Sequence, residues 1–177
     1  MNMELLEQQL SELPLYIYGH IDPKILEFSD RIRWICQNEC PMHAKTWACP
    51  PGVGSVSLCK ERCLQHEKCL LISTITEVGD IADIETTLAT RRDHEDVTNQ
   101  VAEILRNHGE NPYVLSTEAC AICERCAYLD GEPCRYPERM HPCVESHSIN
   151  IIPALEELGI EFQYGENVVT WVSLLFY

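Results

Sequence analysis

Apolar and polar residues alternate along the chain in short blocks, and the spacing within these blocks predicts both helices and strands. Met3 to Leu13 has the spacing of an amphipathic helix, and Pro14 ends it. Further helices are predicted where apolar residues recur every three or four positions and a Pro or Gly marks an end. They cover residues 57–67, 81–108 and 153–158.

Short unbroken apolar runs, rich in β-branched and aromatic residues, predict the strands. The run 168–177 is nearly all apolar, so we expect it inside a sheet. The other predicted strands are 15–18, 69–75, 112–117 and 160–164, whereas 22–36 fits neither period. This alternation predicts an α+β fold, a single compact domain over residues 1–177 with a mixed β-sheet and flanking helices.

Two stretches, 36–57 and 120–143, break both patterns and contain most of the cysteines. Pro and Gly recur in each, so we expect two cysteine-rich loops. The chain has 11 cysteines in 177 residues, an odd number that internal disulfides cannot use completely. The first residues lack the pattern of a signal peptide, which predicts a cytoplasmic protein. Crowded cysteines in a reducing compartment favour metal binding or redox chemistry.

The net charge of the chain limits which classes of partner are expected. Thirteen basic and 28 acidic residues give a net charge of −15. This argues against nucleic acid and anionic membrane, because both require clustered Lys and Arg. No stretch of ~20 apolar residues is present to span a bilayer. We therefore expect a redox partner protein or a small-molecule substrate.

The strongest motif is a C-x2-C-x2-C run formed by Cys120, Cys123 and Cys126, with Cys134 following after a gap of seven residues. Three evenly spaced thiolates with a later fourth resemble the ferredoxin arrangement for a cubane iron–sulfur cluster, although the usual gap is three. Tetrahedral zinc is an alternative, but the middle cysteine then has no obvious role. Catalytic thiols in C-x-x-C pairs are a further alternative.

A second group consists of Cys36, Cys40 and Cys49, each of the last two followed by Pro. Three thiolates on a cubane would leave one iron open to water, substrate or another ligand, and an open metal position is where catalysis can occur. The alternatives are buried thiols or a zinc site closed by a histidine. Candidates for a fourth ligand are His43, Cys59 and Cys63.

The remaining cysteines have simpler interpretations. Cys59, Cys63 and Cys69 lie on a predicted helix and strand, where they can serve as small apolar core residues. Cys143, close to His147, is an open case, because isolated cysteines are often structural. Trp47, two residues before Cys49, can shield a cluster from water or belong to the core.

These motifs together resemble the predicted metal-binding protein family known as domain of unknown function 2284. The resemblance rests on WACPPG (47–52), CAICERC (120–126) and PCRYPERMHPCVES (133–146), and its layout covers nearly the whole chain. It implies metal binding through Cys36, Cys40, Cys49, Cys120, Cys123, Cys126 and Cys134. It also implies an anaerobic bacterial or archaeal setting. Where the family pattern has Ser, this chain has Cys143.

The motifs and the resemblance lead to one main hypothesis and two others. The main hypothesis is an iron–sulfur protein with two 4Fe–4S clusters, acting in electron transfer or cluster-based redox chemistry as an iron–sulfur oxidoreductase. The second is a zinc-stabilised binding module without catalysis. The third is non-redox Lewis-acid or sulfur-transfer chemistry at the open iron of the three-cysteine cluster.

Overall fold

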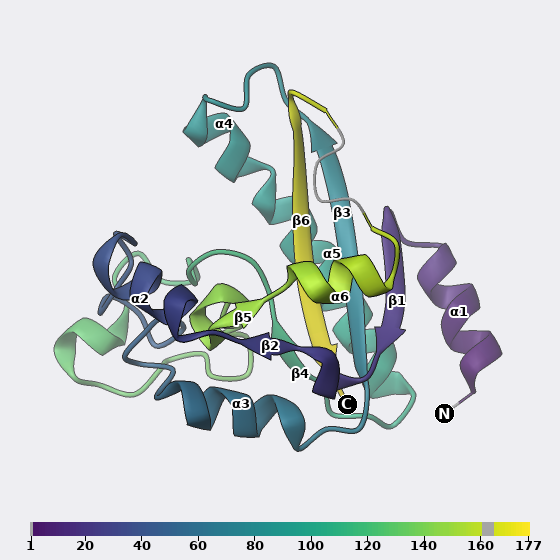
Figure 1. The fold of residues 1–177 in the computed structure, drawn as a ribbon, viewed down its shortest axis with the longest axis horizontal. Helices are drawn as coiled ribbons and strands as arrows, with labels where there is room; N and C mark the ends of the chain where they lie inside the picture. Colours follow the sequence, from purple (N-terminus) through teal and green to yellow (C-terminus); the bar gives the residue numbers. More distant parts are fainter. Residues whose placement is uncertain (1, 161–164) are drawn as a thin grey trace.

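A four-stranded antiparallel sheet forms the centre of the fold in the computed structural model, which describes residues 2–160 and 165–177 (Figure 1). The two long strands β3 and β6 lie side by side in its middle, paired from Cys69–Phe176 to Glu77–Val168. The strand order is β1 (Ile17–Ile21), β3 (Cys69–Glu77), β6 (Val168–Phe176) and β4 (Tyr113–Leu115). A separate two-stranded sheet pairs β2 (Glu27–Phe28) with β5 (Ile149–Asn150).

Six α-helices and three short 3-10 helices connect these strands in the described residues. Side-chain caps fix several helix starts: Ser55, for example, accepts a hydrogen bond from the Leu58 N–H. The α-helices are α1 (Met3–Ser11), α2 (Asp30–Asn38), α3 (Val56–Leu64), α4 (Ile84–Ala89), α5 (Arg91–Asn107) and α6 (Ile152–Glu157). The 3-10 helices are η1 (Pro23–Ile25), η2 (Ala127–Asp130) and η3 (Glu145–His147).

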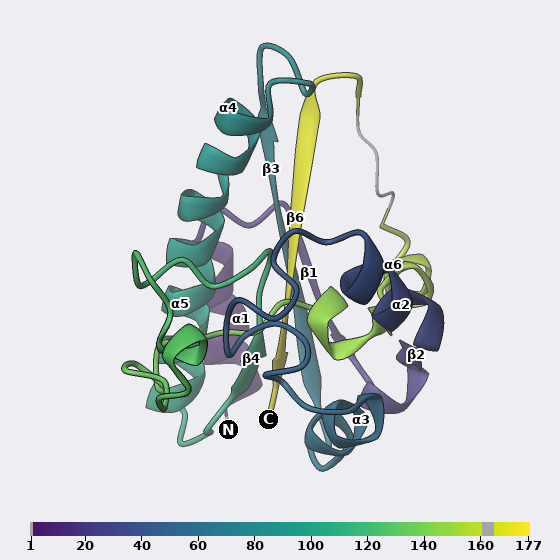
Figure 2. The same cartoon turned by 90° about the vertical axis from the view of Figure 1, so that its left-hand side faces the viewer.

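Alternate residues of the central strands enter two different cores, because successive side chains point to opposite faces of a sheet. Leu70 and Ile72 pack with α1 and α5 on one face. Leu71 and Leu174 pack with α6, with Ile149 of β5 and with Val144 on the other. Figure 2 shows the sheet between these two layers. The strand with the longest apolar run, β6, is thus buried on both faces.

A chain of buried polar side chains also links α5 to the sheet. His94 is 1% exposed; its Nδ1 lies 2.8 Å from Thr74 Oγ1 and its Nε2 lies 2.7 Å from Ser173 Oγ. Ser173 in turn donates to Ser116, which donates to the Glu95 carboxylate at 2.6 Å. Because every member has a partner, the network adds specificity to the way α5 packs on the sheet.

The α+β prediction is confirmed, and the elements differ from the expected ones in detail. The helix expected over 81–108 is two helices that meet at Thr90, and the first strand begins at Ile17. The expected mixed sheet is wrong: every strand pair of the described residues is antiparallel. An apolar run fits a buried strand of either direction, so strand direction could not be inferred from it. The strand expected at 160–164 falls largely on 161–164, outside the described residues.

No helix in the described part of the chain is both long and apolar enough to cross a membrane.

Lowering the pH from about 7 to 5 should reduce the free energy of unfolding, partly through His94. Burial lowers the pKa of His94 from 6.5 to about 4, so the folded protein keeps it neutral while the unfolded chain takes up a proton. The stability present above pH 6.5 is therefore lost towards pH 4, by up to ~1.4 kcal/mol per pH unit. Urea unfolding at several pH values measures this slope.

The variant His94→Asn should be less stable at neutral pH but should show a shallower pH dependence. A slope equal to that of the unchanged protein would contradict the assignment to His94.

Candidate metal centre

The four cysteines of the 120–134 loop line one small cavity. The cavity is also lined by Trp47, Ile122, Tyr136 and Met140. The cysteines that share it are Cys120, Cys123, Cys126 and Cys134. The structure thus brings together all four residues of the strongest sequence motif, including the one that follows the longer gap.

Local turns return Cys134 to the C-x2-C-x2-C run. After η2 the chain reverses at Gly131, which has φ +70°, a left-handed conformation that glycine adopts without a steric penalty. Arg135 then donates to the carbonyl of Arg125 at 2.8 Å, and the Arg125 guanidinium contacts Asp130 at 2.7 Å. These bonds connect the two ends of the seven-residue gap, so its length is no obstacle to a shared site.

The electrostatics of this group favour a bound cation. Burial raises the pKa of the Cys120 thiol, the Ile122 N–H lowers it, and negative charges on Cys134, Cys126 and Cys123 raise it again. Four thiolates in one half-buried space would repel one another, and a bound metal centre would remove that repulsion. The donor set therefore fits a thiolate-bound metal.

The three cysteines of the first loop lie close enough to influence one another. Burial and a negative charge on Cys40 raise the pKa of Cys36 to about 11, Arg33 lowers it, and Cys49 adds a smaller rise. Burial likewise raises the pKa of Cys49, with Cys40 among the further causes. Cys36 lies in the last turn of α2, and the other two follow it in the loop.

The first loop is folded tightly on itself. The Ala44 N–H donates to Pro50 O at 2.8 Å, and a Cβ at Gly52 would lie 2.8 Å from the carbonyl oxygen of Thr46. Only glycine therefore fits at 52 without a backbone shift. This close approach folds the WACPPG segment back on the residues before it.

A buried guanidinium connects the first loop to two other segments. Arg33, on α2, is 8% exposed and donates to Gly54 O, Ser146 O and Ser148 Oγ, each at 3.0 Å. A fourth, longer contact of 3.5 Å reaches Cys59 Sγ on α3. One side chain thus binds the end of the first loop to the turn that contains η3.

The two cysteine groups converge. Trp47 belongs to the first loop, yet its indole N–H donates to Glu132 O at 2.9 Å and its ring meets Tyr128 edge-on at 5.0 Å. A negative charge on Cys120 is among the causes that raise the pKa of Cys49, after burial. Both loops lie on the β4 side of the sheet (Figure 1). Trp47 lines the cavity of the second group, consistent with the expected shielding role.

Among residues 2–160 and 165–177, no three His, Cys, Asp or Glu side chains are arranged closely enough to hold a single metal ion. The buried Nδ1 of His43, in the first loop, has no hydrogen-bond partner in the described part of the chain. Sequence reasoning had named His43 as a candidate fourth ligand, and this unpaired nitrogen leaves it available.

The cysteines outside the two groups are buried. Cys59, Cys63 and Cys69 are 0% exposed, which confirms their interpretation as core residues. Cys143 is 8% exposed, and its sulfur accepts a hydrogen bond from the Ser146 N–H at 3.3 Å. The sequence leaves Cys143 open because it lies outside both cysteine groups.

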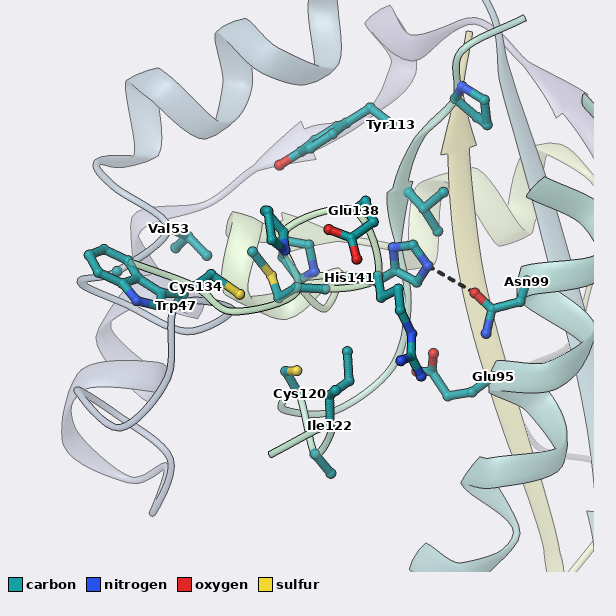
Figure 3. Close-up of a pocket in the computed structure, with 18 of the residues that line it drawn as sticks. Trp47, Val53, Glu95, Asn99, Tyr113, Cys120, Ile122, Cys134, Glu138 and His141 are labelled. Carbon is teal, nitrogen blue, oxygen red and sulfur yellow. Dashed lines mark hydrogen bonds between the residues drawn. The ribbon is translucent and has the colours of Figure 1, made fainter. Parts of the chain in front are cut away.

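A cavity of about 1290 Å³ lies between α5 and the second cysteine loop (Figure 3). Cys120 and Cys134 line it, and Glu95 and Asn99 face it from α5. His141 donates to Asn99 at 3.1 Å; burial and the nearby Arg106 lower its pKa to about 4, so it is neutral at pH 7. Five arginines also line the cavity: Arg62, Arg91, Arg92, Arg106 and Arg139.

The chain belongs to the predicted metal-binding protein family DUF2284, whose model matches residues 19–177. This range includes both cysteine groups, Cys143 and all of the central sheet except the first two residues of β1. No curated protein and no solved structure matches the chain at a significant level. The family defines the class as metal-binding, in agreement with the resemblance found in the sequence.

Replacing Arg33 by Met should lower the free energy of unfolding by about 3 kcal/mol. The change leaves one buried and one partly buried carbonyl without their donor, and each such loss costs roughly 1–3 kcal/mol. Arg31, an exposed residue of the same helix, offers the control, since Arg31→Met should change stability by less than ~0.5 kcal/mol. Urea unfolding of both variants measures the difference; equal effects would contradict the role given to Arg33.

Proposed function

We propose that the protein is an iron–sulfur protein with two 4Fe–4S clusters that transfers electrons. The observation that carries the proposal is the cavity shared by Cys120, Cys123, Cys126 and Cys134. Four thiolates in one space are the ligand set of a cubane cluster, and the C-x2-C-x2-C spacing matches that of ferredoxins. Cys36, Cys40 and Cys49 would bind the second cluster.

The convergence of the two loops supports a role in electron transfer. Trp47 connects them through its bond to Glu132, and Cys49 lies within electrostatic range of Cys120. Two clusters bound at these positions would be neighbours in one small protein. An electron entering at one could then pass to the other and on to a redox partner protein. The reaction served, in an anaerobe or elsewhere, would depend on that partner.

Zinc is the alternative metal, since four thiolates also form a closed zinc site. A zinc-bound protein would be colourless and would have a structural role only. The iron–sulfur protein and the zinc protein differ in their bound metal, so metal analysis decides between them.

Protein purified without oxygen should contain roughly eight irons and eight acid-labile sulfides per chain, four of each per cubane. It should show a visible chromophore that bleaches on reduction. Metal analysis, sulfide determination and the absorption spectrum before and after dithionite test this. Zinc without sulfide would overturn the proposal in favour of the structural module.

The variant Cys123→Ala should lose roughly four of the irons, because it removes one thiolate from one cluster. Cys63→Ala, a change at a core cysteine, should keep them all and offers the matched control. If Cys123→Ala retains the full iron and sulfide content, the ligand assignment in the second loop is wrong.

The large cavity favours a second candidate function, redox chemistry on an anionic small molecule beside the second cluster. Five of the chain's 13 basic side chains line it, although the chain as a whole carries a charge of −15. In the described residues Arg91 and Arg106 pair with Glu95 and Glu103, whereas Arg139 is in no ion pair. Glu95 accepts from Ser116 and could exchange a proton with a molecule in the cavity.

Inorganic phosphate offers a simple probe of this cavity. We expect the metal-loaded protein to bind it in calorimetry, and Arg139→Gln to weaken the binding by about tenfold, or ~1.4 kcal/mol. Arg31→Gln, far along the chain on α2, should leave it unchanged. Equal affinity in all three proteins, or no binding at all, would count against an anion site.

A further inference from the structure

Cys143 is a buried thiol whose position is fixed by the sheet rather than by a loop. The Ser116 N–H donates to Pro142 O at 2.8 Å, and the Val144 N–H donates to Ser116 O at 3.1 Å. These bonds form a short parallel bridge between Cys143 and Ser116, directly after the end of β4. The backbone that carries this sulfur is therefore as well anchored as a strand residue.

The turn that follows Cys143 is bonded to the helix that carries the first cysteine of the first group. Cys36 Sγ lies 3.6 Å from Glu145 O, and Arg33 donates to Ser146 O at 3.0 Å. Burial raises the pKa of Cys143, as do negative charges on Glu145 and, to a smaller extent, Cys49. Cys143 thus shares a region with the first group, more than 90 positions away in sequence.

One contact of Cys143 would stabilise a thiolate there. The Ser146 N–H points at its sulfur from 3.3 Å, and an amide donor of this kind stabilises a negative sulfur and adjusts cluster potentials. The Arg33 guanidinium donates to the carbonyl of the same Ser146, and no described carboxylate is within 4 Å of that guanidinium. A buried cation without a carboxylate requires another source of negative charge. Thiolates on a metal centre would supply it.

We propose that Cys143 is the fourth thiolate of the first group, which binds its metal centre through Cys36, Cys40, Cys49 and Cys143. This inference rests on the proposed function and alters one part of it. With three thiolates the first cluster keeps an open iron, whereas with four it is closed and acts only as a carrier. Substrate chemistry, where it occurs, then belongs to the large cavity beside the second group.

The other candidates for the fourth position fit less well. Cys59 is held by Arg33 and lies 3.7 Å from Val53 O, within the core between α3 and the first loop. Cys63 is wholly buried among the apolar residues packed on the sheet. His43 has an unpaired buried nitrogen and is the serious competitor, so it enters the experiment.

The test compares Cys143→Ala with His43→Ala and Cys63→Ala, all purified without oxygen. In Cys143→Ala we expect iron and sulfide to fall from roughly eight to roughly four per chain, or the first cluster to survive with one weakly held iron. Ferricyanide reveals the second case: it takes one electron from the cubane, which releases that iron as Fe2+ and leaves a paramagnetic three-iron cluster. Electron paramagnetic resonance detects it.

The unchanged protein and the other two variants should keep their iron and show no three-iron signal. The inference is overturned if Cys143→Ala keeps all its iron without that signal, or if the unchanged protein already gives it. It is also overturned if His43→Ala, and not Cys143→Ala, loses the iron or gives the three-iron signal. If Cys143→Ala fails to fold, Cys143→Ser, which keeps the side-chain size, is measured in its place. An unchanged protein without iron and sulfide overturns the proposed function itself, a result distinct from all of these.

Discussion

The buried guanidinium of Arg33 is the contact on which the geometry of the first site depends. It donates to backbone carbonyls of two segments that are far apart in sequence, at Gly54 and Ser146. Neither segment belongs to the central sheet, so sheet pairing alone does not place them side by side. Burying a charge is costly, and it is tolerated where hydrogen bonds and an opposite charge surround it. The backbone carbonyls supply the hydrogen bonds, and thiolates of the proposed metal centre would supply the opposite charge.

Electrostatics also explains why metal binding and folding are expected to be coupled here. Burial and mutual repulsion raise the pKa values of Cys36, Cys49 and Cys120, so these thiols hold their protons without a cation. A metal centre bound by these residues would replace those protons and join segments from different parts of the chain. The free energy of metal binding would then stabilise the loops, whereas the packing of the two-layered core involves no such group.

The core could be predicted from the sequence, and much of the site could not. Long apolar runs fixed β3 and β6, because nine-residue strands buried on both faces require such runs. Cys134 lines the same cavity as Cys120, since spacing within one loop limits where it can lie, and its role as a ligand stays a prediction. Cys143 follows Cys134 after eight residues, and that spacing does not show that the turn after Cys143 contacts α2: this contact arises from the bridge to Ser116, the approach of Cys36 Sγ to Glu145 O and the bond from Arg33 to Ser146 O. Those are tertiary contacts, and local periodicity carries no information about them.

The position of the large cavity suggests different roles for the two cysteine groups. It is lined by Cys120 and Cys134, and the first loop contributes Trp47, Gly52 and Val53 but none of its cysteines. A molecule in the cavity would therefore meet the second group directly and the first only through Trp47 and the second group. If both groups bind clusters as proposed, the first would exchange electrons with a partner protein and the second would pass them to the cavity. The polar chain from His94 through Ser173 and Ser116 ends at Glu95 in that same cavity, where it can hold or accept a proton. Under the proposed function, electron and proton routes would meet at this one place, as proton-coupled reduction of a bound anion requires.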